Sequence, residues 1–233
     1  MQDFRRYAIY WAPSPGGGAD VAGHWLGWNP ATGKAVPQPA LPAPLAAWAK
    51  APRKYGFHGT IKAPFRLAEG WDQDRLSACV KELCAKLVRV SLPGLFLRRV
   101  GSFLALTPDG EGAGLQALAA RVVTDLDAAR APLTAAEIQR RRPERLSPDQ
   151  RALMDRWGYP FVSWGYPFVM GEFRFHLSVS GPLAPADLDR LHPIAEAYFA
   201  PHLPRPFVIA ELCLFGEAED GRFHLVSRHS LGG

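Results

Sequence analysis

Apolar residues recur every three or four positions in three stretches of the chain, which is the spacing of one face of an α-helix. The clearest stretch is 72–90, where Asp72 is a candidate N-cap and the apolar positions are Leu76, Val80, Leu83 and Leu87. The other two stretches are 115–126 and 185–199. Segments rich in β-branched, aromatic and other apolar residues predict strands at 6–12, 95–100, 102–107, 207–215 and 222–228.

Two further strand-like stretches carry one short pattern, a histidine followed two positions later by a hydroxyl residue. They read FHGTIK (residues 57–62) and FHLSVS (residues 175–180). Side chains two positions apart in a strand point to the same face. We therefore expect His58, Thr60 and Lys62 to share one face, and His176 and Ser178 to share another. Two such strands laid side by side would place two imidazoles and two hydroxyls around one point.

Each motif strand opens the same order of elements: motif strand, helix, strand, strand. This internal repeat predicts an α+β fold with two pseudo-symmetric lobes around a central cleft. Each lobe would be an antiparallel-rich sheet with helices on its outside, and both motif strands would face the cleft. Residues 1–233 are accordingly expected to form a single two-lobed domain.

A literal duplication precedes the second motif. The stretch WGYPFV at residues 157–162 recurs at 164–169, with Ser163 between the copies. Both copies cannot occupy the same structural position, so the duplication predicts a local insertion with one copy looped out. The sequence leaves open which copy that is.

Composition is typical of a folded soluble protein, and the positive net charge suits an anionic ligand. The chain of 233 residues is 48% hydrophobic and 21% charged, with a net charge of +5 that is modest for a nucleic-acid partner. The three cysteines form no CxxC pair, as expected in a reducing cytoplasm. No apolar run is long enough for a signal sequence or a membrane span. We expect a cytoplasmic monomer without a membrane partner.

Two histidines with near-neutral pKa values suit acid/base chemistry at a phosphodiester, because one takes a proton from the nucleophile and the other protonates the leaving oxygen. Thr60 and Ser178 would donate hydrogen bonds to the phosphoryl oxygens, and Lys62 would supply a cation. A single histidine on a strand is more often packed in the protein than catalytic. The recurrence of the pattern at His58 and His176 favours catalysis.

Other candidates for substrate binding are weaker. Arg6 and Tyr10 on the first strand reach the cleft in one interpretation, and Tyr10 belongs to the core in another. Tyr55 and Tyr166 lie beside glycine and proline near the motifs, where they would stack a base or sugar, or simply anchor loops. Arg142 belongs to a basic run that either lines an anion-binding mouth or ends a solvated helix.

Several ligand classes find no support in the sequence. A zinc site needs at least three converging ligands, and the chain has neither an HExxH motif nor paired cysteines. The phosphate-binding patterns GxxxxGK[ST] and GxGxxG on a strand are also absent. No metal or other cofactor is expected.

The two motifs, HGT at His58 and HLS at His176, resemble the twin H-x-(T/S) motifs of the 2H phosphoesterase superfamily. The segments RYAIYWAP, KYGFHGTIKAPFRL, RRRPERLSP, RWGYPFV and FRFHLSVSG look like the DUF1045 family, which is associated with phosphonate metabolism. The resemblance covers nearly the whole chain. It implies a two-lobed LigT-like fold, metal-independent hydrolysis of 2′,3′-cyclic phosphates or related phosphodiesters, catalytic His58 and His176, and phosphate-binding Thr60 and Ser178.

The leading hypothesis is a phosphoric diester hydrolase acting on a small cyclic or linear phosphodiester, a nucleotide or ribose phosphate. His58 is assigned as base and His176 as acid, although the pseudo-symmetry leaves the reverse open. Two alternatives remain at this stage. One is a 2H protein that processes or ligates RNA ends, and the other is a non-catalytic module that binds a phosphorylated metabolite.

Overall fold

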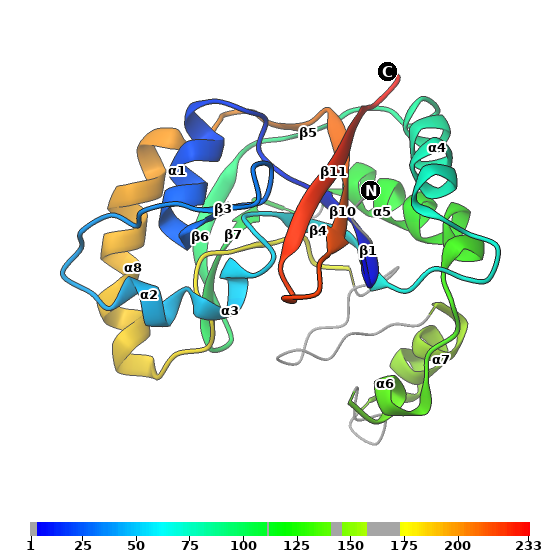
Figure 1. Ribbon diagram of the computed structural model, residues 1–233. Helices are drawn as coiled ribbons and strands as arrows, with labels where there is room; N and C mark the ends of the chain where they lie inside the picture. The colour runs from blue at the N-terminus through cyan, green and yellow to red at the C-terminus, as the bar shows by residue number, and fades with distance from the viewer. Residues whose placement is uncertain (1–3, 111, 141–145, 158–172) are drawn as a thin grey trace.

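A seven-stranded antiparallel sheet forms the centre of the computed structural model (Figure 1). The structure describes residues 4–110, 112–140, 146–157 and 173–233. Within them the strand order is β11-β10-β1-β4-β8-β7-β6, so β4 and β8 are neighbours in the middle. The strands are β1 (Arg6–Trp11), β4 (Gly59–Phe65), β6 (Leu95–Val100), β7 (Phe103–Pro108), β8 (Leu177–Ser178), β10 (Glu211–Glu217) and β11 (Phe223–Ser230).

Smaller elements surround this sheet. Two short ladders pair β2 (Trp28–Asn29) with β3 (Lys34–Ala35), and β5 (Val90–Leu92) with β9 (Phe207–Ile209). The described α-helices are α1 (Gly17–Leu26), α2 (Leu45–Trp48), α3 (Lys50–Arg53), α4 (Gln73–Cys84), α5 (Ala113–Asp125), α6 (Ala135–Arg140), α7 (Pro148–Trp157) and α8 (Pro185–Phe199). Single 3₁₀ turns follow α5 at η1 (Asp127–Ala129) and α8 at η4 (Ala200–His202).

The internal repeat predicted from the sequence is present in the order of elements, with one more strand in each half than predicted. After β4 come α4, β5, β6 and β7, and after β8 come α8, β9, β10 and β11. The equivalent strands β5 and β9 pair with each other, as do β4 and β8. The α+β class is therefore confirmed, and the two halves share one continuous sheet whose middle is the β4–β8 pair.

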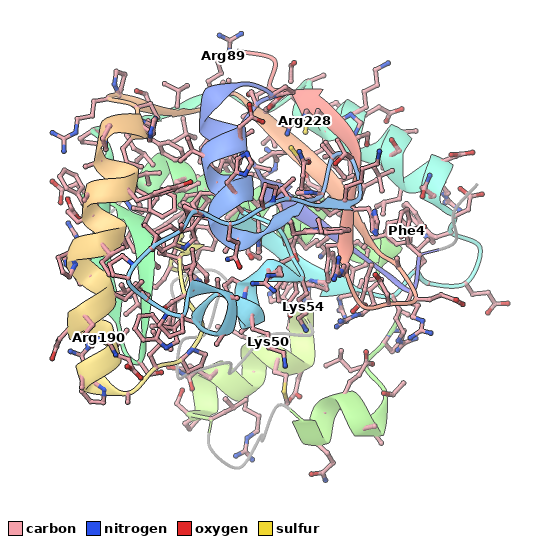
Figure 2. The ribbon with its side chains drawn as sticks, turned by 60° about the vertical axis from the view of Figure 1, so that its left-hand side comes forward. Phe4, Lys50, Lys54, Arg89, Arg190 and Arg228 are labelled. Atoms are coloured by element: carbon pink, nitrogen blue, oxygen red, sulfur yellow. The ribbon has the colours of Figure 1, made fainter. Side chains whose placement is uncertain are left out.

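Each helix of the repeat packs on the hairpin of the other half. Helix α4 contacts β10 and β11, whereas α8 contacts β6 and β7. Figure 1 shows α8 beside β6 and β7 at one end of the sheet, with α4 at the other end. In the turned view α8 runs along one side of the molecule, with Arg190 toward its lower end (Figure 2). The halves are thus interlocked.

The helices cover one face of the sheet because that face is apolar. Ile9, Ile61, Leu104 and Leu177 alternate with cleft-facing residues along their strands and are at most 1% exposed in the main core. Burying each such side chain contributes about 1.5–3 kcal/mol. The opposite face carries a smaller buried cluster that includes Tyr10, Phe215 and Phe223, and the candidate site lies beside it.

Element boundaries follow local hydrogen bonding. The Asp72 carboxylate accepts a hydrogen bond from the Arg75 amide at 2.8 Å, so the predicted N-cap of α4 is confirmed. The single strand predicted at 207–215 is wrong, because β9 and β10 are separated at Ala210. At Ala210 the pairing partner changes, because β9 pairs with β5 whereas β10 pairs with β1. The Ala210 carbonyl accepts a hydrogen bond from the Leu231 amide. In the part of the chain that is described, no helix has the length and apolar character needed to cross a membrane.

Candidate active site

The pairing register of β4 and β8 brings the two motifs together. Gly59 lies opposite Leu177 in an antiparallel ladder. This register places Thr60 opposite His176 and His58 opposite Ser178. All four side chains therefore belong to the same face of the sheet, the one opposite the helices.

Gly59 is required by the neighbouring strand. A Cβ added at this position would overlap the Phe175 ring, which crosses directly over the glycine backbone. The ring of Phe175 is buried, at 5% exposed, and so is fixed in place. The glycine between His58 and Thr60 is thus a packing requirement of the strand pair, whereas the second motif tolerates Leu177 at the equivalent position.

The four motif residues line one small cleft with a volume of about 190 Å³. Of the residues singled out in the sequence, the cleft contains Arg6, Tyr10, Tyr55, His58, Thr60, His176 and Ser178. The predicted convergence of the two motifs is therefore present in the structure.

Both imidazoles are oriented in the same way. His58 Nδ1 lies 2.8 Å from the Gly56 carbonyl, and His176 Nδ1 lies 2.9 Å from the Arg174 carbonyl. A carbonyl only accepts hydrogen bonds, so Nδ1 must carry the proton in each neutral ring. Nε2 is then the basic nitrogen of both histidines, which is the tautomer needed for a general base.

The surroundings keep both rings neutral at neutral pH. The pKa of His58 is lowered to about 4, mainly by desolvation and to a smaller extent by the nearby His176, while the Gly56 hydrogen bond opposes the shift. Desolvation also lowers the pKa of His176, against the hydrogen bond to Arg174. A bound phosphodiester brings negative charge and would raise both pKa values again. Ligand binding would therefore favour protonation of one ring.

Different aromatic neighbours distinguish the two histidines. The His58 ring lies 3.9 Å from the Tyr10 ring, centroid to centroid, and 5.6 Å from the Tyr55 ring. His176 has Phe103 as its neighbour at 5.8 Å. Tyr10 is only 1% exposed. Tyr10 thus combines the two roles that the sequence left open, because it is a core residue that also borders the cleft.

Lys62 does not share the face of His58, so that prediction is wrong. Tyr10 pairs with Thr60 but Ile9 pairs with Lys62, which means that β4 contains one extra residue between these two pairs, a β-bulge and one of two register shifts in this ladder. The bulge turns Lys62 to the helix side. There its Nζ donates a hydrogen bond to the Val123 carbonyl of α5 at 3.1 Å. The cation expected in the cleft is buried beneath the sheet instead.

Arg6 borders the cleft, but its charge is already paired. It lies directly opposite Glu217 in the β1–β10 ladder. Nε and Nη2 of Arg6 donate to the two carboxylate oxygens of Glu217 at 2.5 and 2.8 Å. The carboxylate raises the pKa of Arg6. This pair fixes the guanidinium at the rim and weakens it as a phosphate ligand.

Two predicted site residues, Arg142 and Tyr166, lie outside the described residues. The same holds for both copies of the duplicated WGYPFV stretch apart from Trp157 at the end of α7. Their proposed contacts with a substrate stay predictions.

Sequence reasoning gave no role to Phe103, Phe175 or Glu217. Phe175 had a visible signal, because a phenylalanine precedes the histidine in both motifs. Phe57, its counterpart, stacks on Phe199 of α8 at 5.6 Å. Phe103 and Glu217 reach the site through long-range strand pairing, for which the local sequence offers no signal.

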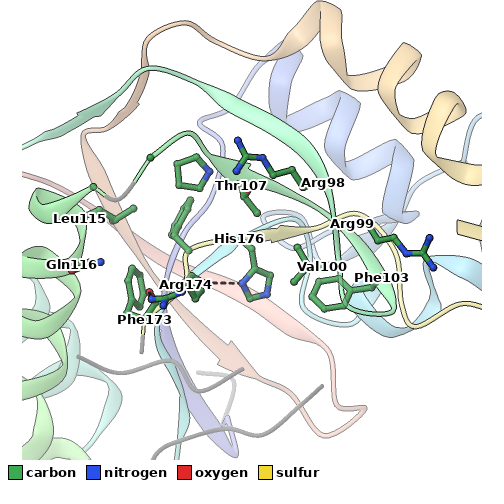
Figure 3. Close-up of a pocket in the computed structure, with 14 residues that line it drawn as sticks. Arg98, Arg99, Val100, Phe103, Thr107, Leu115, Gln116, Phe173, Arg174 and His176 are labelled. Carbon is green, nitrogen blue, oxygen red and sulfur yellow. Dashed lines mark hydrogen bonds between the residues drawn. The ribbon is translucent and has the colours of Figure 1, made fainter. Parts of the chain in front are cut away.

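A second, larger pocket adjoins the cleft at His176 (Figure 3). Its volume is about 460 Å³, and it shares His176 and Phe103 with the cleft. Its wall includes Arg98, Thr107, Gln116 and Arg174. The site is therefore a small two-histidine cleft that opens into a wider pocket with basic side chains.

Fold and site together define an α+β protein with an internal repeat and a two-histidine cleft on the axis of that repeat. Among the described residues, no group of three histidine, cysteine, aspartate or glutamate side chains is placed to hold a metal ion.

The chain belongs to the family described as "Protein of unknown function (DUF1045)", which matches residues 60–163 and 162–224. This confirms the resemblance noted in the sequence. The match comes in two segments that overlap at residues 162–163, within the WGYPFV duplication.

Two curated relatives share one printed name, "Ribose 1,5-bisphosphate phosphokinase PhnN". The protein of Janthinobacterium sp. (strain Marseille) is 37% identical over 209 residues, which are 85% of this chain and 44% of that protein. The protein of Laribacter hongkongensis (strain HLHK9) is 30% identical over 220 residues, 93% and 49% of the two chains. The chain thus spans about half the length of the curated relatives it matches.

Solved structures with similar topology include E. coli LigT. The apo form has a TM-score of 0.45 and 14% identity over 99% of both chains. The form complexed with NADP+ has a TM-score of 0.43 and 11% identity over 99% of this chain and 100% of that one.

Proposed function

We propose that the protein is a phosphoric diester hydrolase that opens a small cyclic phosphodiester of a ribose phosphate by two-histidine acid/base catalysis. The β4–β8 register is the observation that supports this best, because it places both H-x-(T/S) motifs on one face around one cleft. The shared Nδ1 hydrogen bonds add to it by leaving Nε2 of each ring as the reactive nitrogen.

In the proposed step, Nε2 of His58 takes a proton from a water molecule, whose oxygen forms a bond to phosphorus. His176 is the ring that becomes protonated at Nε2 when the anionic substrate binds, and it gives this proton to the ribose oxygen as the bond from phosphorus to that oxygen breaks. Thr60 and Ser178 donate hydrogen bonds to the non-bridging oxygens, where negative charge accumulates. Proton exchange with solvent then returns both rings to their starting states.

The assignment of His58 as base follows from its surroundings. Its pKa, lowered to about 4, keeps the ring unprotonated at neutral pH. His176 borders the wider pocket as well as the cleft, so a leaving group in that pocket has access to it.

The names of the relatives suggest the substrate class. A phosphate closed between O1 and O2 of ribose 5-phosphate, opened at O2, gives ribose 1,5-bisphosphate, which those names describe as a kinase substrate. This chain has no GxxxxGK[ST] motif and matches about half of each relative. We assign the phosphokinase activity to the other half of those proteins, and the supply of its substrate to the half that this chain matches.

A panel of 2′,3′-, 3′,5′- and 1,2-cyclic phosphates tests the proposal. His58→Ala and His176→Ala should each lower kcat by at least about a hundredfold, the usual contribution of a general acid or base. His24→Ala is a matched control, because exposed His24 also has its Nδ1 on a backbone carbonyl, that of Pro37, but lies outside the cleft. Full activity of both cleft variants on every substrate that the wild type hydrolyses would refute the mechanism.

One observation favours a second function. The lowered pKa values leave neither histidine protonated at neutral pH in the free protein, as suits a module that only binds a phosphorylated metabolite. Calorimetric binding of a cyclic phosphate without turnover by the wild type would support that alternative.

A further inference from the structure

The pocket next to the cleft lies on the same face of the sheet as the two motifs. Ser178 of β8 lies opposite Ala105 of β7, and Ala105 lies opposite Arg98 of β6. Neighbouring strands are about 4.8 Å apart, so the Cα atoms of Ser178 and Arg98 are separated by roughly 10 Å. The residue between them, Ala105, is fully buried, and the cleft and the pocket are connected by His176 and Phe103, which line both.

Arg98 and its neighbour Arg99 point to opposite faces of β6. Arg99 forms an ion pair with Asp189 of α8, on the helix side of the sheet, at 3.3 Å. Figure 3 shows the two guanidinium groups pointing in different directions, with that of Arg98 on the side of Thr107. Both arginines are among the residues that line the pocket, but the ion pair with Asp189 holds the Arg99 side chain on the helix side. Only the Arg98 guanidinium is therefore directed over the pocket face.

Three features make this pocket positive. Arg98 and Arg174 both line it, and Nη1 of Arg174 donates to the Phe173 carbonyl at 3.0 Å. The first turn of α5 borders it through Leu115 and Gln116, has no acidic residue and receives no side-chain cap from Gly112. A helix N-terminus favours an anion. None of the described residues lining the pocket is an aspartate or glutamate.

The ion pair that Arg98 makes is one that a ligand can replace. Its Nη2 lies 2.8 Å from Oδ1 of Asp109, and the two side chains are 48% and 56% exposed. Exposed ion pairs of this kind contribute little to stability. A phosphate monoester, with more charge and more acceptor oxygens than one carboxylate, competes well for such a guanidinium.

We propose that the pocket lined by Arg98, Arg174 and the start of α5 is a second phosphate subsite. The substrate would then be a cyclic phosphodiester that also carries a phosphate monoester. This inference rests on the proposed function and names its substrate class. The volumes agree with it, because the cleft of about 190 Å³ suits the diester and the adjoining 460 Å³ accommodates a sugar with its second phosphate.

The test compares ribose 1,2-cyclic phosphate with and without a 5-phosphate as substrates. The wild type should prefer the 5-phosphorylated compound in kcat/KM. Arg98→Gln should reduce this preference by about ten- to a hundredfold, as expected for losing hydrogen bonds between charged groups, and Arg98→Lys should restore part of it. Arg99→Gln, the matched control, should leave the preference unchanged.

A second measurement separates this inference from the proposed function. Ribose 1,5-bisphosphate is titrated into His58→Ala, whose substitution lies outside the second pocket. Adding Arg98→Gln should raise its Kd at least about tenfold, whereas adding Arg99→Gln should not. If Arg98→Gln weakens binding while the wild type shows no turnover, the result supports the phosphate subsite and refutes the proposed hydrolase activity. Equal preferences and equal Kd values for the Arg98 and Arg99 variants, or a wild-type preference for an unphosphorylated cyclic nucleotide, would overturn the subsite.

Discussion

The chemistry of individual residues in this site depends on what lies against them. The His58 ring is packed on buried Tyr10 at 3.9 Å, whereas Phe103 lies 5.8 Å from His176. Contact with Tyr10 excludes water from one side of the His58 ring, and desolvation disfavours its charged form. Two histidines in equivalent positions of a repeat can therefore have different protonation behaviour.

This difference predicts that kcat/KM falls on the acidic side of its pH profile (the acid limb) at an unusually low pH. A base must be unprotonated, so the fall of kcat/KM at acidic pH should lie near pH 4, to which the pKa of His58 is lowered, instead of near pH 6.5. Tyr10→Leu should admit water and move the limb to higher pH. Phe103→Leu, next to the other histidine, should not move it. Identical acid limbs in the wild type and Tyr10→Leu would exclude this role for Tyr10.

Gly59 provides a second prediction for a single residue. Gly59→Ala places a methyl group where the Phe175 ring lies, and such overpacking typically lowers the free energy of unfolding by about 1–3 kcal/mol. Activity should also fall, because displacing Phe175 disturbs the β4–β8 register that places His58 opposite Ser178. Gly18→Ala in α1 is the control, because a Cβ added at Gly18 would meet no other atom within 4 Å. Denaturant unfolding with equal midpoints for both variants would contradict the packing argument.

Single elements show how a bulge changes the partners of a strand. Ile61 and Lys62 of β4 both turn toward the helices, and the Lys62 Nζ lies 3.9 Å from the Asp127 carboxylate after α5. Burial lowers the pKa of Lys62 to about 8, although Asp127 opposes the shift. Lys62 therefore joins β4 to α5.

Lys62→Met tests this placement. The substitution should leave kcat/KM within about threefold of wild type, because the side chain lies away from the cleft. The lowered pKa means that the unfolded chain binds more protons than the native one between pH 8 and 10.5. Wild-type stability therefore gains from this group as pH rises through that window, and the gain should be absent in Lys62→Met. Unfolding curves at pH 7 and 10 measure this gain in stability. A hundredfold loss of activity in Lys62→Met would instead indicate that Lys62 acts in the cleft.

Periodicity predicted those elements whose pattern is local. Helices α4, α5 and α8 and most strands of the large sheet follow from apolar spacing and proline positions. Helix α7 was not predicted, since its one buried residue in the structure is Met154 and it has no apolar stripe. The motif residues His58, Thr60, His176 and Ser178 were recognisable because the pattern occurs twice. The bulge at Lys62 was not, because it depends on pairing with β1.

At the scale of the whole molecule, each half packs its helix on strands of the other half. Helix α4 of the first half packs on β10 and β11 of the second, and α8 packs on β6 and β7 of the first. Neither half can bury its own helix alone. The intact chain should therefore unfold in one cooperative transition.

Splitting the chain tests this interlocking. Fragments 1–145 and 146–233 should each lack cooperative unfolding by circular dichroism, because β1 loses β10 and β8 loses β7. Mixing them should restore sheet signal and a protease-resistant complex. Independent, cooperative melting of either fragment would contradict the prediction.

The exchanged hairpins also bear on how such a chain could arise. A gene for one half would encode one H-x-(T/S) strand, and two copies of its product would form the same cleft across a symmetry axis. Once the two copies are joined in one chain, the residues around each histidine can change independently. The contact of Tyr10 with His58 at 3.9 Å, compared with that of Phe103 with His176 at 5.8 Å, is the kind of divergence that a fused pair permits.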